Sequence, residues 1–169
     1  MSISPHQRQI IRQQIGREPH GLKDIAHATP TGLPVVLRMA PIVDDKPFPT
    51  LYWLCSRDLH KAINQLETHG LVKQLERQLQ DDADFMAAYQ ANQHAYVAAR
   101  WANCSEAEKH QLHKRGFSDL FASYGIGGLR DWQQIRCLHM HYAHHLCDNN
   151  VIGQWLDSEY QLNQLVLNI

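Results

Sequence analysis

Thiol and imidazole side chains are concentrated between residues 132 and 147. If this stretch is one helix, at about 100° per residue, Cys137, His141 and His144 fall within about 60° of one another. A thiolate and two imidazoles are suitable partial ligands for zinc or iron, and Cys55 is the natural further donor. We therefore predict a metal site formed by these four residues. The alternative is that His141 and His144 are polar residues that face solvent.

His139 belongs to the same stretch but lies on its apolar side. On a straight helix it is about 140° from His144, so the two imidazoles are poorly placed to share one ion. We expect His139 to be buried and hydrogen-bonded, and we include it among the residues that could contact a bound ligand.

A second chemistry is predicted at Cys55, where an expected strand gives way to a helix that begins near Arg57. A thiol beside a cation at a helix N-terminus has a lowered pKa and a larger thiolate fraction. Cys55 is therefore a candidate catalytic nucleophile. A phosphatase-like loop is disfavoured, because Lys61 stands where that loop requires arginine. The alternative is a small buried cysteine that packs where the strand meets the helix.

A glycine-rich loop at 125–128 precedes a helix that is expected to start at Arg130. The backbone N–H groups of such a loop, together with a cation, can bind a phosphate or a carboxylate. The spacing is neither that of a Walker A loop nor that of a dinucleotide-binding fold. The alternative is a flexible connection. The candidate ligand-binding residues are Arg17, Gly127, Gly128, Arg130 and His139.

These side chains must be positioned by a mostly helical framework. Hydrophobic periodicity and capping residues, such as Ser105 followed by Glu108, predict the helices. Two β-branched or aromatic segments, 35–39 and 50–54, predict one antiparallel hairpin, and 16–34 is expected to be an ordered loop. The expected helices cover about 4–15, 59–66 and 72–79 (one interrupted helix or two short ones), 81–103, 106–114, 130–147 and 152–166.

Composition limits the class of protein. A length of 169 residues, of which 44% are hydrophobic, is sufficient for a single domain over 1–169 with its own core. We expect an α+β fold that is predominantly helical, with a small antiparallel β-hairpin. The formal net charge of -1 argues against nonspecific nucleic-acid binding, and neither a membrane span nor a signal peptide is recognisable. We therefore expect a cytoplasmic protein.

Four motifs occur together along the chain. They are Gly16-Arg17-Glu18-Pro19-His20-Gly21, Pro47-Phe48-Pro49-Thr50-Leu51-Tyr52-Trp53-Leu54, Gly125-Ile126-Gly127-Gly128 and Ile135-Arg136-Cys137-Leu138-His139-x4-His144. With them the chain, over about residues 10 to 155, resembles a family of small bacterial proteins that is catalogued only as a conserved domain of unknown function. The resemblance implies no activity.

In this family, cysteines often occupy an Arg-Cys-Pro-x-Gly loop, the position after the Pro-Phe-Pro-Thr strand, and the Cys-Leu-His motif. Cys55 and Cys137 match the last two positions, whereas Thr29 takes the first. The three-cysteine metal or iron–sulfur site that the resemblance would imply is therefore not expected here. The resemblance also favours His139 and His144 over His141.

Three classes of function remain open. The first, which we favour, is binding of a metal ion or a small anionic ligand in a pocket where Cys55, the 125–128 loop and the Cys137 helix converge. The second is an enzyme that acts on a phosphorylated or carboxylated metabolite in that pocket. The third is a helical module that docks onto a protein partner or a second copy of the chain. Its contact surface would be formed by Trp101, Trp155 or the C-terminal residues Leu162, Leu165, Val166 and Ile169.

Overall fold

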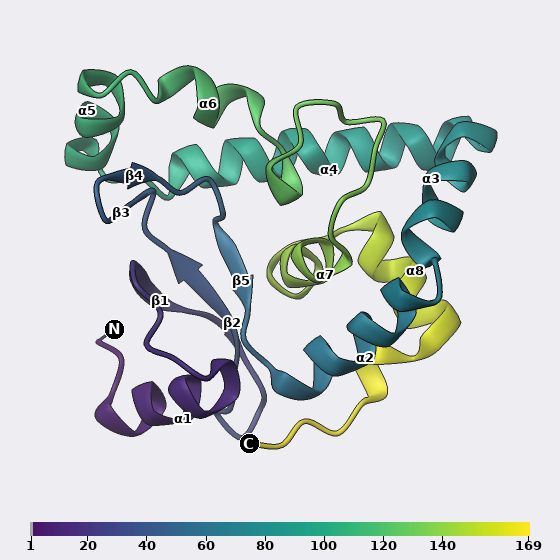
Figure 1. The fold of residues 1–169 in the computed structure, drawn as a ribbon, viewed down its shortest axis with the longest axis horizontal. Helices are drawn as coiled ribbons and strands as arrows, with labels where there is room; N and C mark the ends of the chain where they lie inside the picture. Colours follow the sequence, from purple (N-terminus) through teal and green to yellow (C-terminus); the bar gives the residue numbers. More distant parts are fainter. Residues whose placement is uncertain (1) are drawn as a thin grey trace.

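The chain begins with a helix at the sheet end of the molecule (Figure 1). In the computed structural model, which describes residues 2–169, this helix is α1 (Pro5–Ile15). The Ser4 hydroxyl accepts a hydrogen bond from the Gln7 N–H, and the Gln7 side chain accepts one from the Ser4 N–H, which together form a capping box. Gly16 ends the helix in the left-handed conformation, with φ 77°. The helix predicted over 4–15 is confirmed.

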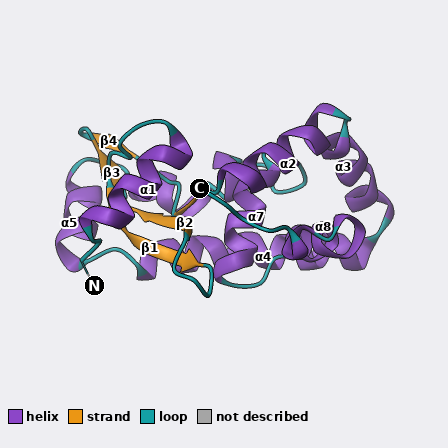
Figure 2. Ribbon diagram, turned by 90° about the horizontal axis from the view of Figure 1, so that it is seen from below, coloured by secondary structure: helices purple, strands orange, loops and turns teal. Residues whose placement is uncertain are grey.

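Three antiparallel strands form the main sheet in the order β1-β2-β5 (Figure 1), and Figure 2 shows β1 and β2 side by side from below. They are β1 (Leu22–Ala28), β2 (Pro34–Met39) and β5 (Tyr52–Leu54). The predicted hairpin is confirmed as β2 and β5, in which Leu37 lies opposite Trp53. The prediction of an ordered loop over 16–34 is wrong for residues 22–28, which form β1. All residues of β1 are partly buried and its pairing with β2 contains register shifts, so its sequence lacks the clean alternation that identifies a strand.

A second, two-stranded ladder lies in the connection between β2 and β5. It consists of β3 (Ile42–Val43) and β4 (Lys46–Pro47), which pair antiparallel. A two-residue turn at Asp44 and Asp45 joins them. Both residues have positive φ, 50° and 62°, as a tight two-residue hairpin turn requires.

The helices predicted between residues 59 and 114 are confirmed. They are α2 (Arg57–Thr68), α3 (Leu71–Asp81), α4 (Ala83–Ala102) and α5 (Glu106–Lys114). Gly70, with φ 85°, separates α2 from α3, so this region is two helices rather than one. Asp82 caps α4, and Ser105 with Glu108 forms the predicted capping box of α5. The short helix α6 (Ser118–Ser123) was not predicted.

The helix predicted over 130–147 is wrong in its first half. The segment 129–137 contains turns but no helix, and α7 (Leu138–Cys147) begins only after it. Tertiary hydrogen bonds hold this segment in a non-helical conformation: the side chain of Glu76 accepts the Ile135 N–H at 2.8 Å, and the Tyr89 hydroxyl donates to the Gln134 carbonyl at 2.5 Å. These contacts come from α3 and α4, so the local sequence does not reveal them.

The C-terminal helix is also shorter than predicted. Helix α8 (Val151–Tyr160) ends where Gln161 adopts a left-handed conformation with φ 52°. A single 3-10 turn, Leu162–Gln164, follows, and another covers Ile126–Gly128 before α7. The predicted helix 152–166 is therefore correct only for its first part.

Helix α7 lies near the centre of the fold, next to α2, α8 and β5 (Figure 1). Its Leu138, Tyr142 and Ala143 belong to the main hydrophobic core, and a smaller core lies between α1 and the sheet. The α+β class with mostly helical content is thus confirmed. Among residues 2–169, no helix has both the length and the hydrophobicity needed to cross a bilayer.

Candidate metal centre

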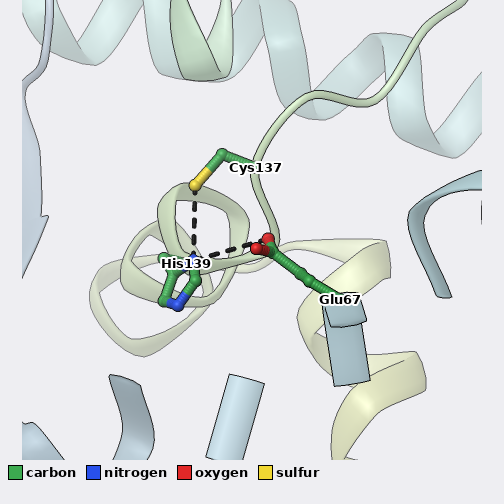
Figure 3. Close-up of side chains that lie close together, drawn as sticks. All are labelled: Glu67, Cys137 and His139. Atoms are coloured by element: carbon green, nitrogen blue, oxygen red, sulfur yellow. Dashed lines mark hydrogen bonds and ion pairs between the residues drawn. The ribbon is translucent and has the colours of Figure 1, made fainter. Parts of the chain in front are cut away.

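Three side chains of metal-ligand type converge where the end of α2 meets the start of α7 (Figure 3). They are Glu67, Cys137 and His139, and one ligand atom from each lies within 4.8 Å of the others. The His139 Nδ1 atom is 3.5 Å from Cys137 Sγ and 3.4 Å from Glu67 Oε1. The group therefore offers one sulfur, one nitrogen and one oxygen around a common centre.

The start of α7 explains why Glu67 is there. Cys137 occupies the N-cap position with an extended backbone, φ -142° and ψ 113°, and its side chain makes no cap hydrogen bond. The Glu67 carboxylate supplies the missing acceptor instead, since its Oε1 accepts the Leu138 N–H at 2.8 Å. A carboxylate from α2 thus caps α7 from another part of the chain, and the same carboxylate meets the thiol and the imidazole.

The orientation of His139 is fixed by His60 of α2. The Nε2 atom of His139 lies 3.3 Å from the His60 carbonyl, which can only accept, so Nε2 carries the hydrogen and donates it. The two imidazole rings also pack together, with centroids 4.2 Å apart. Nδ1 of His139 therefore presents a lone pair to the thiol and the carboxylate, as in a metal-ligating histidine whose other nitrogen is held by a carbonyl.

Burial and charge shape the environment of this group. Burial raises the pKa of the Cys137 thiol, and the Glu67 carboxylate raises it further, while nearby backbone N–H groups and Arg136 oppose the shift. The His139 side chain is 9% exposed and that of Glu67 is 26% exposed. The group is thus largely desolvated but can be reached from the side of Glu67.

The structure brings Cys137 together with His139 rather than with His141 or His144. The predicted shared face assumed a helix through Cys137, but α7 starts after it. His141 and His144 are fully buried and lie instead against Asn150, whose Nδ2 is 3.3 Å and 3.1 Å from their Nδ1 atoms. The alternative, that His141 and His144 face solvent, is therefore wrong. The expectation that His139 is buried and hydrogen-bonded is confirmed.

Cys55 lies apart from this group. It is 1% exposed and packs in the smaller core between α1 and the sheet. Burial raises the pKa of its thiol to about 12, so the lowered pKa predicted for a nucleophile at this helix start is wrong. The Gln14 side chain donates to its sulfur at 3.9 Å. The alternative of a packed cysteine at the strand–helix junction describes this environment.

The predicted ligand-binding loop at 125–128 is tied to α4. Gln93 Oε1 accepts the Ile126 N–H at 2.6 Å, and a Cβ atom on Gly125 would meet the same oxygen at 2.2 Å. Gly127 and Gly128 have φ 73°, and no helix starts at Arg130, which lies over the Tyr124 ring at 5.6 Å. The close approach of α4 therefore accounts for the glycine at 125 and for the loop's fixed position.

The structure does not bring Arg17 together with the glycine loop. Arg17 lies over the Trp53 ring at 5.2 Å and lines two neighbouring cavities, neither of which is lined by described residues of 125–130. Gly127 does lie beside Cys137, since a Cβ atom added to it would be 4.0 Å from that of Cys137. Of the predicted convergence of Cys55, the 125–128 loop and Cys137, the structure therefore shows the loop beside Cys137, while Cys55 lies elsewhere.

Sequence reasoning missed Glu67 and His60. Both lie on α2, and no motif marks either of them as a partner of the Cys137 segment. From the sequence alone, a carboxylate near the end of an amphipathic helix is predicted to be an ordinary solvent-exposed residue. Only the packing of α2 against α7 turns Glu67 toward the thiol.

Comparison with known proteins gives a family but no activity. A protein-family model described as "Protein of unknown function (DUF501)" matches residues 25–158. No curated protein and no solved structure matches the chain.

Proposed function

This chain belongs to the DUF501 family, whose function is unknown, and from its own geometry we propose that it is a metal-binding protein that holds zinc at Glu67, Cys137 and His139. The mixture of sulfur, nitrogen and oxygen ligands suits zinc, which accepts all three. An iron–sulfur cluster generally requires several thiolates, and Cys137 is the one thiol of this group. Zinc is therefore preferred over iron.

The observation that carries the proposal is the spacing around His139 Nδ1. Ligand atoms of a tetrahedral zinc at about 2.0 to 2.3 Å from the metal lie about 3.3 to 3.7 Å from one another. The distances from Nδ1 to Cys137 Sγ and Glu67 Oε1, 3.5 Å and 3.4 Å, fall in this range. In the neutral imidazole with its hydrogen on Nε2, the lone pair of Nδ1 faces the carboxylate oxygen, an arrangement that a cation between them would stabilise.

Three protein ligands leave a fourth coordination position for water or a small molecule. This is the pattern of catalytic zinc sites rather than of closed structural ones. When bound, zinc would act there as a Lewis acid and lower the pKa of a coordinated water. The chain's own contribution is to fix His139 through the His60 carbonyl and to hold Glu67 at the start of α7.

The sharpest test compares two glutamates that do the same structural work. Glu67 and Glu76 each accept one backbone N–H at 2.8 Å, from Leu138 and Ile135 respectively. In E67Q and E76Q the amide oxygen can keep that hydrogen bond while the charge is lost. We expect E67Q to weaken zinc binding at least about tenfold and E76Q to leave it unchanged. Zinc content after dialysis and competition with a chromophoric chelator measure this.

Two cysteines of similar partial burial provide a second matched pair. C137A should abolish stoichiometric zinc, whereas C147A should retain it. With cobalt(II) in place of zinc, the wild type should show thiolate-to-metal charge transfer that C137A lacks. Stoichiometric zinc that survives in both C137A and E67Q would exclude this group as the metal site.

A further inference from the structure

We infer that the open cavity between α1 and α2 binds a small hydroxylated molecule that carries a phosphate group. The cavity has a volume of about 710 Å³, which is within the range of small-molecule sites. Three cationic side chains line it, Arg17, Arg57 and Lys61, and none of the described residues around it is acidic. The cavity adjoins the metal centre, since His60 lines the cavity and also contacts His139, but the inference does not depend on a bound metal.

The cations come from two walls that face each other. Arg57 and Lys61 are one turn apart on α2, and Arg17 follows α1, where its guanidinium lies over the Trp53 ring. The Arg57 side chain also donates to the Gln13 carbonyl of α1, so a hydrogen bond joins the walls. This arrangement places positive charge on opposite sides of the same space.

The positive charge of the cavity is not neutralised by the protein. Glu18, next in sequence to Arg17, is engaged by Arg8 and Arg12, and the Asp58 carboxylate accepts the Asn168 N–H. Within residues 2–169, none of the three cavity cations forms an ion pair. The arginine and lysine residues that do so are Arg8, Arg12, Lys23, Arg38, Lys109 and Arg115.

Three unpaired cations favour a phosphate over a singly charged carboxylate. A phosphate monoester carries up to two negative charges and three acceptor oxygens at neutral pH, and guanidinium groups bind it through paired N–H donors. Concentrated positive charge around a cavity also raises the local concentration of such anions.

Gln14 indicates a hydrogen-bond donor on the same ligand. Gln14 lines the cavity and is 7% exposed, and its Nε2 donates to the Pro34 carbonyl at 2.8 Å. Its Oε1 is buried and has no hydrogen-bond partner. A buried acceptor without a donor is costly, so a ligand that supplies an O–H would be favoured over a bare phosphate. The ligand class is therefore a phosphate ester with a free hydroxyl.

Glycerol phosphate, which has both groups, is the probe, and inorganic phosphate, glycerol and succinate are its comparators. Titrations at constant ionic strength would be followed by calorimetry and by tryptophan fluorescence. We expect saturable binding of glycerol phosphate, weaker binding of phosphate and succinate, and none of glycerol. W53F should retain binding but lose the fluorescence change, since Trp53 lines the cavity.

Matched charge removal tests the location. R17Q/K61Q removes two cavity cations, and K73Q/R77Q removes two cations from the exposed face of α3, at the same cost in net charge. We expect the first to weaken glycerol phosphate binding at least about tenfold and the second to change it less than about twofold. If the double variant does not fold, R17Q and K61Q alone should each show a smaller loss. Q14L should weaken glycerol phosphate binding but not phosphate binding.

Three outcomes would overturn the inference: no saturable binding of glycerol phosphate to the wild type, equal binding of succinate, or equal losses in R17Q/K61Q and K73Q/R77Q. C137A separates this site from the metal centre. Binding that persists in C137A supports the cavity, whatever the metal content, and binding lost in C137A would assign the anion to the metal instead.

Discussion

At the start of α7, His139 presents its Nδ1 atom to a thiol and a carboxylate, whereas His141 and His144 present theirs to one amide, that of Asn150. An amide N–H₂ can donate to both imidazoles, so it satisfies their Nδ1 atoms, although their buried Nε2 atoms have no hydrogen-bond partner among residues 2–169. A carboxylate has lone pairs but no hydrogen, and a thiol loses its hydrogen when it binds a metal, so these two groups can accept a cation. Histidines on one short helix therefore acquire different capacities from the elements that face them.

The group formed by His141, His144 and Asn150 is built into the core. Asn150 is fully buried, and its Oδ1 caps α8 by accepting the N–H groups of Ile152 and Gly153 at 2.9 Å and 3.2 Å. Because its Nδ2 donates to both Nδ1 atoms, each ring must carry its hydrogen on Nε2. The group is a structural junction between α7 and α8, in contrast to the candidate metal site at the start of α7.

Asn150 should therefore be the most sensitive residue of the two groups. N150A removes the cap of α8 and leaves both buried imidazoles without a donor, so we expect the free energy of unfolding to fall by about 3 kcal/mol. N150S keeps a cap oxygen and should lose less. Urea unfolding measures both, and zinc binding by the folded N150S protein should equal that of the wild type. If N150A lowered the free energy of unfolding by less than about 1 kcal/mol, the group around Asn150 would not have the structural role that distinguishes it from the group around His139.

The same burial should make stability depend on pH. Burial lowers the pKa of His144 to about 4, and His145 lowers it further, although Asp148, 3.8 Å from Nε2, opposes the shift. Burial and His144 lower the pKa of its neighbour His141 to about 3. As the pH falls below about 6.5, these histidines therefore take up protons in the unfolded chain but not in the folded chain. Their contribution to the free energy of unfolding is fully present above that pH and decreases as the pH falls toward the pKa of the folded state.

For His144 alone, the free energy of unfolding should be about 2 kcal/mol lower at pH 5 than at pH 7. H144Q cannot take up that proton. Its free energy of unfolding should therefore fall by about 2 kcal/mol less than that of the wild type between pH 7 and pH 5. H110Q is the control, because His110 is exposed on α5. Equal slopes for H144Q and the wild type, from urea unfolding at several pH values, would show that His144 does not resist protonation.

Local signals predicted the framework better than the site. The capping residues Ser4, Asp82 and Ser105 marked true helix starts, because a cap acts within one turn of its own chain. The edge strand β1 and the non-helical segment 129–137 were missed, since their conformations depend on partners from β2, α3 and α4.

The site shows the same division. Cys137 and His139 were singled out by residue type, but their grouping followed a helical periodicity that does not reach Cys137. The third member of the group, Glu67 on α2, could not be predicted from the sequence, because no motif near Cys137 indicates a partner on α2. Likewise, Arg17 was selected but assigned to the glycine loop, whereas in the structure it lines the same cavity as Lys61.

The smallest effect is expected at the start of α7 itself. Cys137 is partly exposed and makes no cap hydrogen bond, so without metal C137A should change the free energy of unfolding by less than about 1 kcal/mol. Free zinc at ten times its dissociation constant should stabilise the wild type by about 1.4 kcal/mol and leave C137A unchanged, because only a folded state that binds the ion gains from it. Urea unfolding with and without zinc, with C147A as the control, separates the two contributions. If zinc stabilised C137A as much as C147A, Cys137 would have no role in holding the ion, and the start of α7 would be as purely structural as the group around Asn150.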